Sequence, residues 1–372
     1  MVNMTPRIKI GTKKVLLNEF MKDCEDIYFY HKADGRKIIP VQDTEKNNRA
    51  KQKLKEIYTK HKNDIPKRFI ENWNKVKLFD SSGNVEHAHA ILLEPEEGSY
   101  DINNGLNHLT GKEWTTFSCS WFIFNALPKD IKEEREICGN TEDHPATYSP
   151  TMMEHFIKFF TKEGMSVLDP FAGIGSTLVG CKRTGRIGYG IELNPKYFNS
   201  ILKRVPEFKN NIINGDSRDV KNQFKSKKFD FCISSPPYWN VLNRSTGSFK
   251  KTRSSKGLDV KYSNSLVDLG NISDYEKFLE DTTKIYLDIY DLMNDGSYLI
   301  VIVKNIKKGG RFYPLAWDMA KILSKRYALK DEKIWIQDKI GLAPYGYPHT
   351  WTANILHHYC LIFRKEKENG KI

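Results

Sequence analysis

From residue 148 onwards, the chain alternates amphipathic segments with short apolar runs. The first amphipathic segment begins at Pro150, a residue suited to the first turn of a helix. Apolar side chains then recur at helical spacing, at Met153, Phe156, Ile157 and Phe160. This spacing predicts an α-helix with one buried face.

The apolar runs between the amphipathic segments predict strands, and polar turn residues follow several of them. The predicted strands cover residues 166–168, 187–191, 212–214, 229–233, 298–304, 332–337 and 357–364. Strands separated by helices form a doubly wound α/β sheet. We therefore expect a mostly parallel, seven-stranded, Rossmann-like sheet that binds its ligands at the carboxyl ends of its strands.

Two regions depart from this alternation. Residues 1–104 are predicted as a basic, mainly helical extension, and residues 105–372 as the catalytic domain. In the extension, the Lys- and Asn-rich segment 45–78 has apolar residues at helical spacing, and either a solvated face or DNA contact would explain it. The basic segment 240–272 is too long for an ordinary connection, which indicates a functional or a disordered loop.

Charge and cysteine usage narrow the class of protein. A net charge of +13 and a pI of about 9.2 favour a nucleic-acid partner, although a Lys-rich source proteome would also produce them. The cysteines show neither a CxxC pair nor a zinc-like spacing, so we expect no metal; Cys181, Cys232 and Cys360 are expected in the core. With no signal region or membrane-length apolar run, the expected location is cytoplasmic.

A Gly-rich turn follows the strand 166–168 and leads into a helix. Gly173 and Gly175 permit close backbone approach, and the helix start offers free N–H groups. A nucleotide pyrophosphate would suit such a turn, which keeps a Rossmann dehydrogenase as an alternative. However, the pattern is not G-x-G-x-x-G, and Asp169 would repel a pyrophosphate. A carboxylate there suits the cationic, phosphate-free methionine end of S-adenosylmethionine.

Acidic residues also end the next two strands. Glu192 ends the strand 187–191, where an acid commonly accepts hydrogen bonds from ribose hydroxyls, and Asp216 ends the strand 212–214, where it can receive an adenine amino group. Solvated loop acids would explain one of these positions but not all three. The predicted cofactor-binding residues in these motifs are Asp169, Phe171, Gly173, Gly175, Thr177, Glu192, Asp216 and Ser217.

Residues Ser235-Pro236-Pro237-Tyr238 follow the strand 229–233 and form the second candidate motif. The prolines fix the backbone and remove N–H donors, which leaves carbonyl groups pointing outward. An exocyclic amine on a nucleobase is a poor nucleophile until acceptors such as the Ser235 hydroxyl and the Pro236 carbonyl hold its hydrogens. Stacking of the base on Tyr238 would contribute about 1–3 kcal/mol. These four residues are the predicted catalytic residues; an ordinary Pro-Pro loop is the alternative.

A base in a duplex reaches such a turn only after it is flipped out of the stack. Basic side chains in segment 240–272 are candidates for holding the DNA meanwhile, with arginines reading base edges and lysines contacting phosphates. The ring that follows the turn could extend the stacking platform or belong to the core. The predicted substrate-binding residues of this region are Trp239, Arg244, Lys250, Lys251 and Arg253.

Taken together, residues 105–365 resemble the S-adenosylmethionine-dependent DNA amino-methyltransferases that modify cytosine N4 or adenine N6. The resemblance implies that His144 and Pro145 close over the methionine moiety and that Tyr347 lies in a loop against the flipped base. Here the cofactor motif precedes the acceptor motif, whereas many family members have the reverse order. The leading Ser235, in place of Asp, favours cytosine N4 over adenine N6.

The resemblance further implies double-stranded DNA as the substrate and a role in restriction-modification, with a cognate restriction endonuclease as an expected partner. The absence of a Pro-Cys dipeptide argues against the carbon-5 cytosine enzymes, which need a nucleophilic cysteine. An RNA amino-methyltransferase and a protein glutamine methyltransferase remain alternatives. A non-catalytic DNA-binding protein is a third, although Asp169, Glu192 and Ser235 are all acceptable for catalysis.

Overall fold

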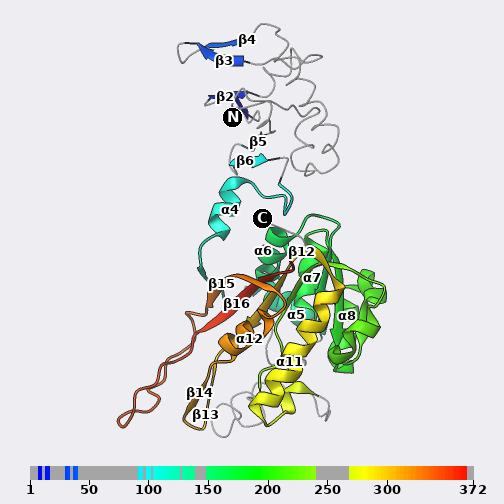
Figure 1. The fold of residues 1–372 in the computed structure, drawn as a ribbon, viewed down its shortest axis with the longest axis vertical. Helices are drawn as coiled ribbons and strands as arrows, with labels where there is room; N and C mark the ends of the chain where they lie inside the picture. Colours follow the sequence, from blue (N-terminus) through cyan, green and yellow to red (C-terminus); the bar gives the residue numbers. More distant parts are fainter. Residues whose placement is uncertain are drawn as a thin grey trace. The chain divides into compact units, whose positions relative to one another are not determined.

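The structure is a computed structural model, and it divides into two compact units, Met1–Ser118 and Cys119–Ile372 (Figure 1). The residues that it describes are 7–10, 13–16, 30–33, 37–40, 91–94, 98–101, 104–125, 128–138, 148–239 and 268–366.

The described part of the first unit consists mainly of short strands that the sequence did not predict. They are β1 (Arg7–Ile10), β2 (Lys13–Leu16), β3 (Tyr30–Ala33), β4 (Lys37–Pro40), β5 (Ile91–Glu94) and β6 (Gly98–Asp101). Four form a sheet in the order β2-β1-β5-β6, and β3 pairs with β4. Helix α4 (Gly111–Phe117) begins with a capping box between Thr110 and Glu113. The predicted helical segment 45–78 lies outside the described residues.

An eight-stranded sheet, in the order β10-β9-β8-β11-β12-β16-β15-β7, forms the centre of the second unit. Its strands are β7 (Trp121–Ile123), β8 (Ser166–Asp169), β9 (Ile187–Glu192), β10 (Ile212–Asn214), β11 (Phe229–Ser234), β12 (Met293–Val303), β15 (Ala328–Ile336) and β16 (His357–Arg364). Strands β8 to β12 run parallel, and β16 is antiparallel to both of its neighbours. The predicted doubly wound, mostly parallel sheet is confirmed; β7 adds an eighth strand, too short to give a periodic signal.

The helices of this unit follow from the winding of the sheet. Within the described residues, the α-helices are α5 (Pro128–Cys138), α6 (Pro150–Phe160), α7 (Ser176–Arg183), α8 (Pro195–Arg204), α9 (Val220–Gln223), α11 (Tyr275–Ile289) and α12 (Leu315–Leu323). From β8 the chain winds outward through β9 to β10, and from β11 it winds the other way to β12. Right-handed crossovers therefore place α7 and α8 on one face and α11 on the other. Helix α6 packs on α7, and α12 packs on α11.

The core confirms the predicted apolar positions. Helix α6 begins at Pro150, with Ser149 as its N-cap, and buries the predicted apolar face together with Met152 and Phe159. Cys181, Cys232 and Cys360 are fully buried. No helix in the described part of the chain has the length and apolarity needed to span a membrane.

Candidate active site

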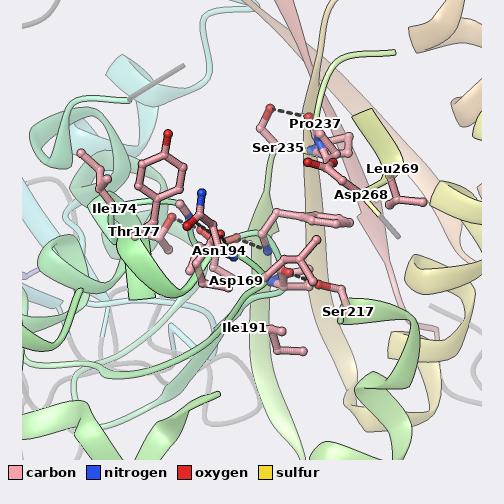
Figure 2. A pocket seen from close by; sticks show the side chains of 18 of the residues that line it. Asp169, Ile174, Thr177, Ile191, Asn194, Ser217, Ser235, Pro237, Asp268 and Leu269 are labelled. Atoms are coloured by element: carbon pink, nitrogen blue, oxygen red, sulfur yellow. Dashed lines mark hydrogen bonds between the residues drawn. The ribbon is translucent and has the colours of Figure 1, made fainter. Parts of the chain in front are cut away.

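A cavity opens at the carboxyl edge of the parallel strands (Figure 2). It lies where β8 and β11 are neighbours, which is the point at which the strand order reverses. Doubly wound sheets bind their ligands at such a point because the connections on the two sides diverge there. Both predicted motifs contribute to the lining, the Gly-rich turn after β8 and the Ser-Pro-Pro-Tyr turn after β11.

Asp169 ends β8 and ties the Gly-rich turn to the start of α7. Its Oδ1 accepts a hydrogen bond from the Phe171 backbone N–H at 3.0 Å, and its Oδ2 accepts one from the Thr177 hydroxyl at 2.6 Å. Burial raises the pKa of Asp169 to about 6, and these two donors oppose the rise. The site therefore holds a carboxylate whose charge is incompletely compensated by the protein.

The glycines of the turn have different functions. The Gly173 N–H points inward and donates to Glu192. Gly175 has a φ of 86° and precedes α7, and a Cβ there would lie 3.2 Å from Ile201, so the position needs glycine for conformation and space. Gly175 does not line the cavity, in contrast to the predicted direct role. The Arg204 guanidinium holds the turn from behind by donating to the Ile174 carbonyl at 2.7 Å.

Glu192 ends β9 and faces the cavity. Its Oε1 accepts from the Asn194 N–H at 2.7 Å, and its Oε2 accepts from the Gly173 N–H at 2.8 Å. Burial raises the pKa of Glu192 to about 8, against the effect of the two N–H donors. Each carboxylate oxygen has capacity for a further hydrogen bond, so the side chain can accept two hydroxyl groups of a ligand.

Asp216 and Ser217 end β10 and also line the cavity. The Asp216 carboxylate caps the Arg218 N–H at 2.9 Å and forms an ion pair with the Arg218 guanidinium. The Ser217 hydroxyl donates to the Pro170 carbonyl and so links the end of β10 to the turn after β8. Ser217 therefore has a structural bond in addition to its place in the lining.

The chemistry of the lining fits S-adenosylmethionine better than a nucleotide pyrophosphate. Among the described lining residues there are four acids, namely Asp169, Glu192, Asp216 and Asp268, and neither Lys nor Arg. The buried Ser176 hydroxyl has no hydrogen-bond partner within the part of the chain that the structure describes, so a ligand can supply one. An acidic cavity with an unpaired hydroxyl suits a cationic ligand that carries hydroxyl and amino groups.

The acceptor turn lies in the same cavity, and Figure 2 shows Ser235 and Pro237 beside it. The Ser235 hydroxyl is 3.5 Å from the Pro236 carbonyl oxygen, at the limit of a hydrogen bond, so both oxygens have capacity for an incoming amine. The Tyr238 hydroxyl is hydrogen-bonded to His358 Nε2 at 2.9 Å. Burial raises the pKa of Tyr238 to about 12, which keeps its phenol protonated.

The sequence did not indicate the residues that support Tyr238. His358 lies on β16, 120 residues away, and its ring stacks on Trp335 of β15 at 4.5 Å. Burial lowers the pKa of His358 to about 3, so the imidazole is neutral. Tyr148, which precedes α6, also lines the cavity. Pairing of β15 with β16 places Trp335 opposite His358, and no local sequence motif indicates this contact.

Several predicted substrate-binding residues do not line the cavity. Trp239 is buried and packs against the rings of Tyr275 and Tyr313, so the core interpretation holds for it. Tyr347 is 81% exposed and is not among the residues that line the cavity. The predicted residues that lie outside the described part of the chain are His144, Pro145, Arg244, Lys250, Lys251 and Arg253.

Comparisons with known proteins show what the chain is similar to. The model of a DNA methylase family that includes N6- and N4-specific enzymes matches residues 5–203. The chain is 31% identical over 125 residues to the type II methyltransferase M.BglI of Bacillus subtilis, covering 33% of this chain and 31% of that protein. It is 24% identical over 203 residues to the type II methyltransferase M.MjaII of Methanocaldococcus jannaschii, covering 50% and 37%.

Among solved structures, a methyltransferase from Pyrococcus furiosus matches with a TM-score of 0.38 and 17% identity, covering 64% of this chain and 98% of that one. The chain spans about a third of the length of the curated relatives that it matches. The family match includes β8, the Gly-rich turn and Glu192, and ends before the acceptor turn. Because it covers more than half of the sequence, the chain belongs to the N6/N4 DNA methylase family.

Proposed function

We propose that this protein is a site-specific DNA methyltransferase that modifies the exocyclic N4 of a flipped-out cytosine in duplex DNA. The observation that carries this proposal is the joint lining of one cavity by the acidic Gly-rich turn and the Ser-Pro-Pro-Tyr turn. S-adenosylmethionine, the predicted cofactor, is the methyl donor of this family, and when bound it supplies an activated methyl group on its sulfonium. Asp169, Glu192 and Asp216 would hold it.

The acceptor turn prepares the amine for attack. The Ser235 hydroxyl and the Pro236 carbonyl accept the two amine hydrogens, and the lone pair is thereby withdrawn from conjugation with the ring. Pro236 and Pro237 hold the turn rigid, so these oxygens do not reorganise during the reaction. The turn contains no cysteine, the nucleophile that the carbon-5 cytosine enzymes need, which supports direct transfer without a covalent enzyme intermediate.

Tyr238 forms the wall on which the flipped base stacks. Its hydroxyl is fixed by the neutral His358, which in turn stacks on Trp335, so the ring is held before the base arrives. A preorganised wall is effective because binding then costs little side-chain entropy. The proposed role of the tyrosine is therefore stacking, with its hydroxyl serving to orient the ring.

The choice of base rests on the leading serine of the turn. In the family that these motifs resemble, Ser-Pro-Pro-Tyr followed by Trp favours cytosine N4, whereas Asp in place of the serine favours adenine N6. Adenine N6 is therefore the alternative. The relatives named type II methyltransferases support a role as the modification enzyme of a restriction system. A cognate restriction endonuclease remains a prediction, as does DNA contact by segment 240–272.

Nucleoside mass spectrometry of DNA from cells that express the protein tests this proposal, with Ser235→Ala as the matched control. We expect N4-methylcytosine with the wild type only. Detection of N6-methyladenine would support methylation of an amino group in DNA, but it would show that the target base is adenine and not cytosine. If neither base appears while S-adenosylmethionine still binds, the DNA substrate is wrong and structured RNA becomes the substrate to test.

A further inference from the structure

The loop between β15 and β16, residues 337–356, is termed here the aromatic loop. In the sheet, Ile336 pairs with His357 and Val303 pairs with Tyr359, so the loop leaves the sheet at the carboxyl end of β12. This is the edge at which the cavity opens. His358, two residues after the end of the loop, is hydrogen-bonded to Tyr238. The aromatic loop therefore ends beside the acceptor turn.

A second projection lies against the aromatic loop. The hairpin of β13 (Ile306–Lys308) and β14 (Arg311–Tyr313) directly follows β12. The Lys307 ammonium on this hairpin donates to the Thr352 hydroxyl at 2.6 Å and to the Ala353 carbonyl at 2.5 Å. The hairpin and the aromatic loop extend in the same direction from the sheet (Figure 1).

The aromatic loop is also held by bonds of its own. At its base, the Asn354 side-chain amide accepts from the Ala343 N–H at 3.1 Å and donates to the Ala343 carbonyl at 2.9 Å. Near its tip, the Thr350 N–H donates to the Gly346 carbonyl at 2.7 Å. Gly346 has a φ of 81°, and a Cβ there would lie 2.8 Å from the Thr350 hydroxyl. The loop therefore has a defined conformation that directs its large side chains outward.

Three of those side chains are aromatic and face solvent, and Tyr345 among them is 61% exposed. Trp351 is 88% exposed and Tyr347 is 81% exposed. Leaving rings of this size in water is unfavourable, and exposed aromatic clusters on braced segments mark interaction sites. The loop thus presents flat apolar faces to a partner, and it projects from the edge of the sheet at which the cavity opens.

The surrounding charge identifies the class of partner. Residues 304–313 contain Lys304, Lys307, Lys308 and Arg311 and no acidic residue. The aromatic loop contains one acidic residue, Asp338, at its start, and its carboxylate accepts a hydrogen bond from Asn125. A basic surface with protruding aromatic rings fits a polyanion that offers stackable faces, which is nucleic acid.

We propose that Trp351 inserts into the base stack of duplex DNA at the step from which the target base is flipped. The proposal rests on the proposed function. Removing a base from a duplex leaves an unstacked gap, and an apolar side chain that enters it offsets the cost of unstacking. Lys307 and Arg311, which lie on the neighbouring β13–β14 hairpin, would meanwhile contact phosphates of the DNA.

The test compares Trp351→Ala with wild type for methyl transfer from labelled S-adenosylmethionine to unmethylated plasmid DNA, at several salt concentrations. We expect kcat/KM on duplex DNA to fall about tenfold or more, the loss that follows from one stacking contact. Because an inserted ring makes no ion contact, the slope of log kcat/KM against log salt should not change. Trp351→Phe should retain most of the activity.

Trp121→Ala is the matched control, because Trp121 is half exposed but belongs to β7, where it pairs with Ile334 of β15, and is not part of the loop. It should leave kcat/KM unchanged, and all variants should bind S-adenosylmethionine as the wild type does. If Trp351→Ala has the wild-type kcat/KM, or loses activity equally on duplex and heat-denatured DNA, the proposed insertion of Trp351 is wrong. Neither result would overturn the proposed function. A reduced salt slope would instead indicate a displaced basic hairpin, and loss of a dimer in light scattering would indicate a second copy of this chain as the partner.

A wild-type protein that binds S-adenosylmethionine but transfers nothing to DNA would overturn the proposed function, and this proposal with it.

Discussion

Replacing Glu192 by glutamine tests the electrostatic account of the cavity. The carboxylate accepts two backbone N–H bonds, from Asn194 and from Gly173. Glutamine has a single acceptor oxygen, so one of these donors would face an NH₂ group and lose its partner. Leaving one buried donor unpaired costs about 1–3 kcal/mol at any pH. The substitution also removes an ionisable group, and this second effect depends on pH.

The pKa of Glu192 sets the size of the second effect. Burial raises it from 4.5 to about 8 in the folded protein. At about 1.4 kcal/mol for each pKa unit, ionising this side chain in the empty site costs about 5 kcal/mol relative to the unfolded chain. Because the folded pKa is the higher one, the stabilising contribution is present below pH 4.5 and is lost as the pH rises through about 8.

The two effects have opposite signs at high pH. We expect Glu192→Gln to unfold at a lower temperature than wild type at pH 5, and at a higher temperature at pH 9. Thermal unfolding of the ligand-free proteins across this range measures the crossing. Asp169, whose pKa is raised to about 6, titrates in both proteins, but its charge also raises the pKa of Glu192, so it cancels only in part from the difference. Glu280→Gln on α11 is the control, because that side chain is 73% exposed and should show no crossing.

Cofactor binding should show the reverse dependence. An ionised Glu192 accepts two hydroxyl hydrogen bonds, so wild-type affinity for S-adenosylmethionine should rise from pH 6 to pH 9, by at most tenfold per pH unit. Glu192→Gln should bind more weakly and lose this rise. The amino group of the ligand also titrates near pH 8, but it does so equally with both proteins. Two results would refute the reasoning. One is a difference in melting temperature between wild type and Glu192→Gln that does not vary with pH, and the other is the same pH dependence of S-adenosylmethionine affinity in both proteins.

Three further substitutions have defined outcomes. Asp169→Asn should weaken S-adenosylmethionine binding about tenfold or more in calorimetry, because it removes the buried charge; an unchanged Kd would exclude Asp169 from the cofactor site. Gly188→Ala should lower the free energy of unfolding in urea by about 1–3 kcal/mol, because its Cβ would lie 2.8 Å from Leu178 Cδ2, whereas Gly341→Ala meets nothing within 4 Å. Tyr238→Phe should retain more methyl transfer than Tyr238→Ala, and the opposite ranking would assign the hydroxyl a direct role.

The sequence by itself determined the sheet and the two motifs. Alternating apolar runs and amphipathic segments specified the strands, because buried parallel strands need continuous apolar residues and covering helices need one apolar face. Asp169, Glu192 and Ser235 were recognisable because each immediately follows or ends such a run. Topology then requires that they meet at one edge, and they do.

The tertiary structure decided what depends on contacts distant in sequence. The bond between Tyr238 and His358 joins residues 120 apart, and it exists because β16 returns antiparallel beside β12. From the sequence, Trp239 could extend the stacking platform or belong to the core, and its packing against the rings of Tyr275 and Tyr313 shows that it belongs to the core. The fold determines which aromatic rings are buried and which face solvent, because it supplies their neighbours. The hydrophobic periodicity of the sequence does not identify those neighbours.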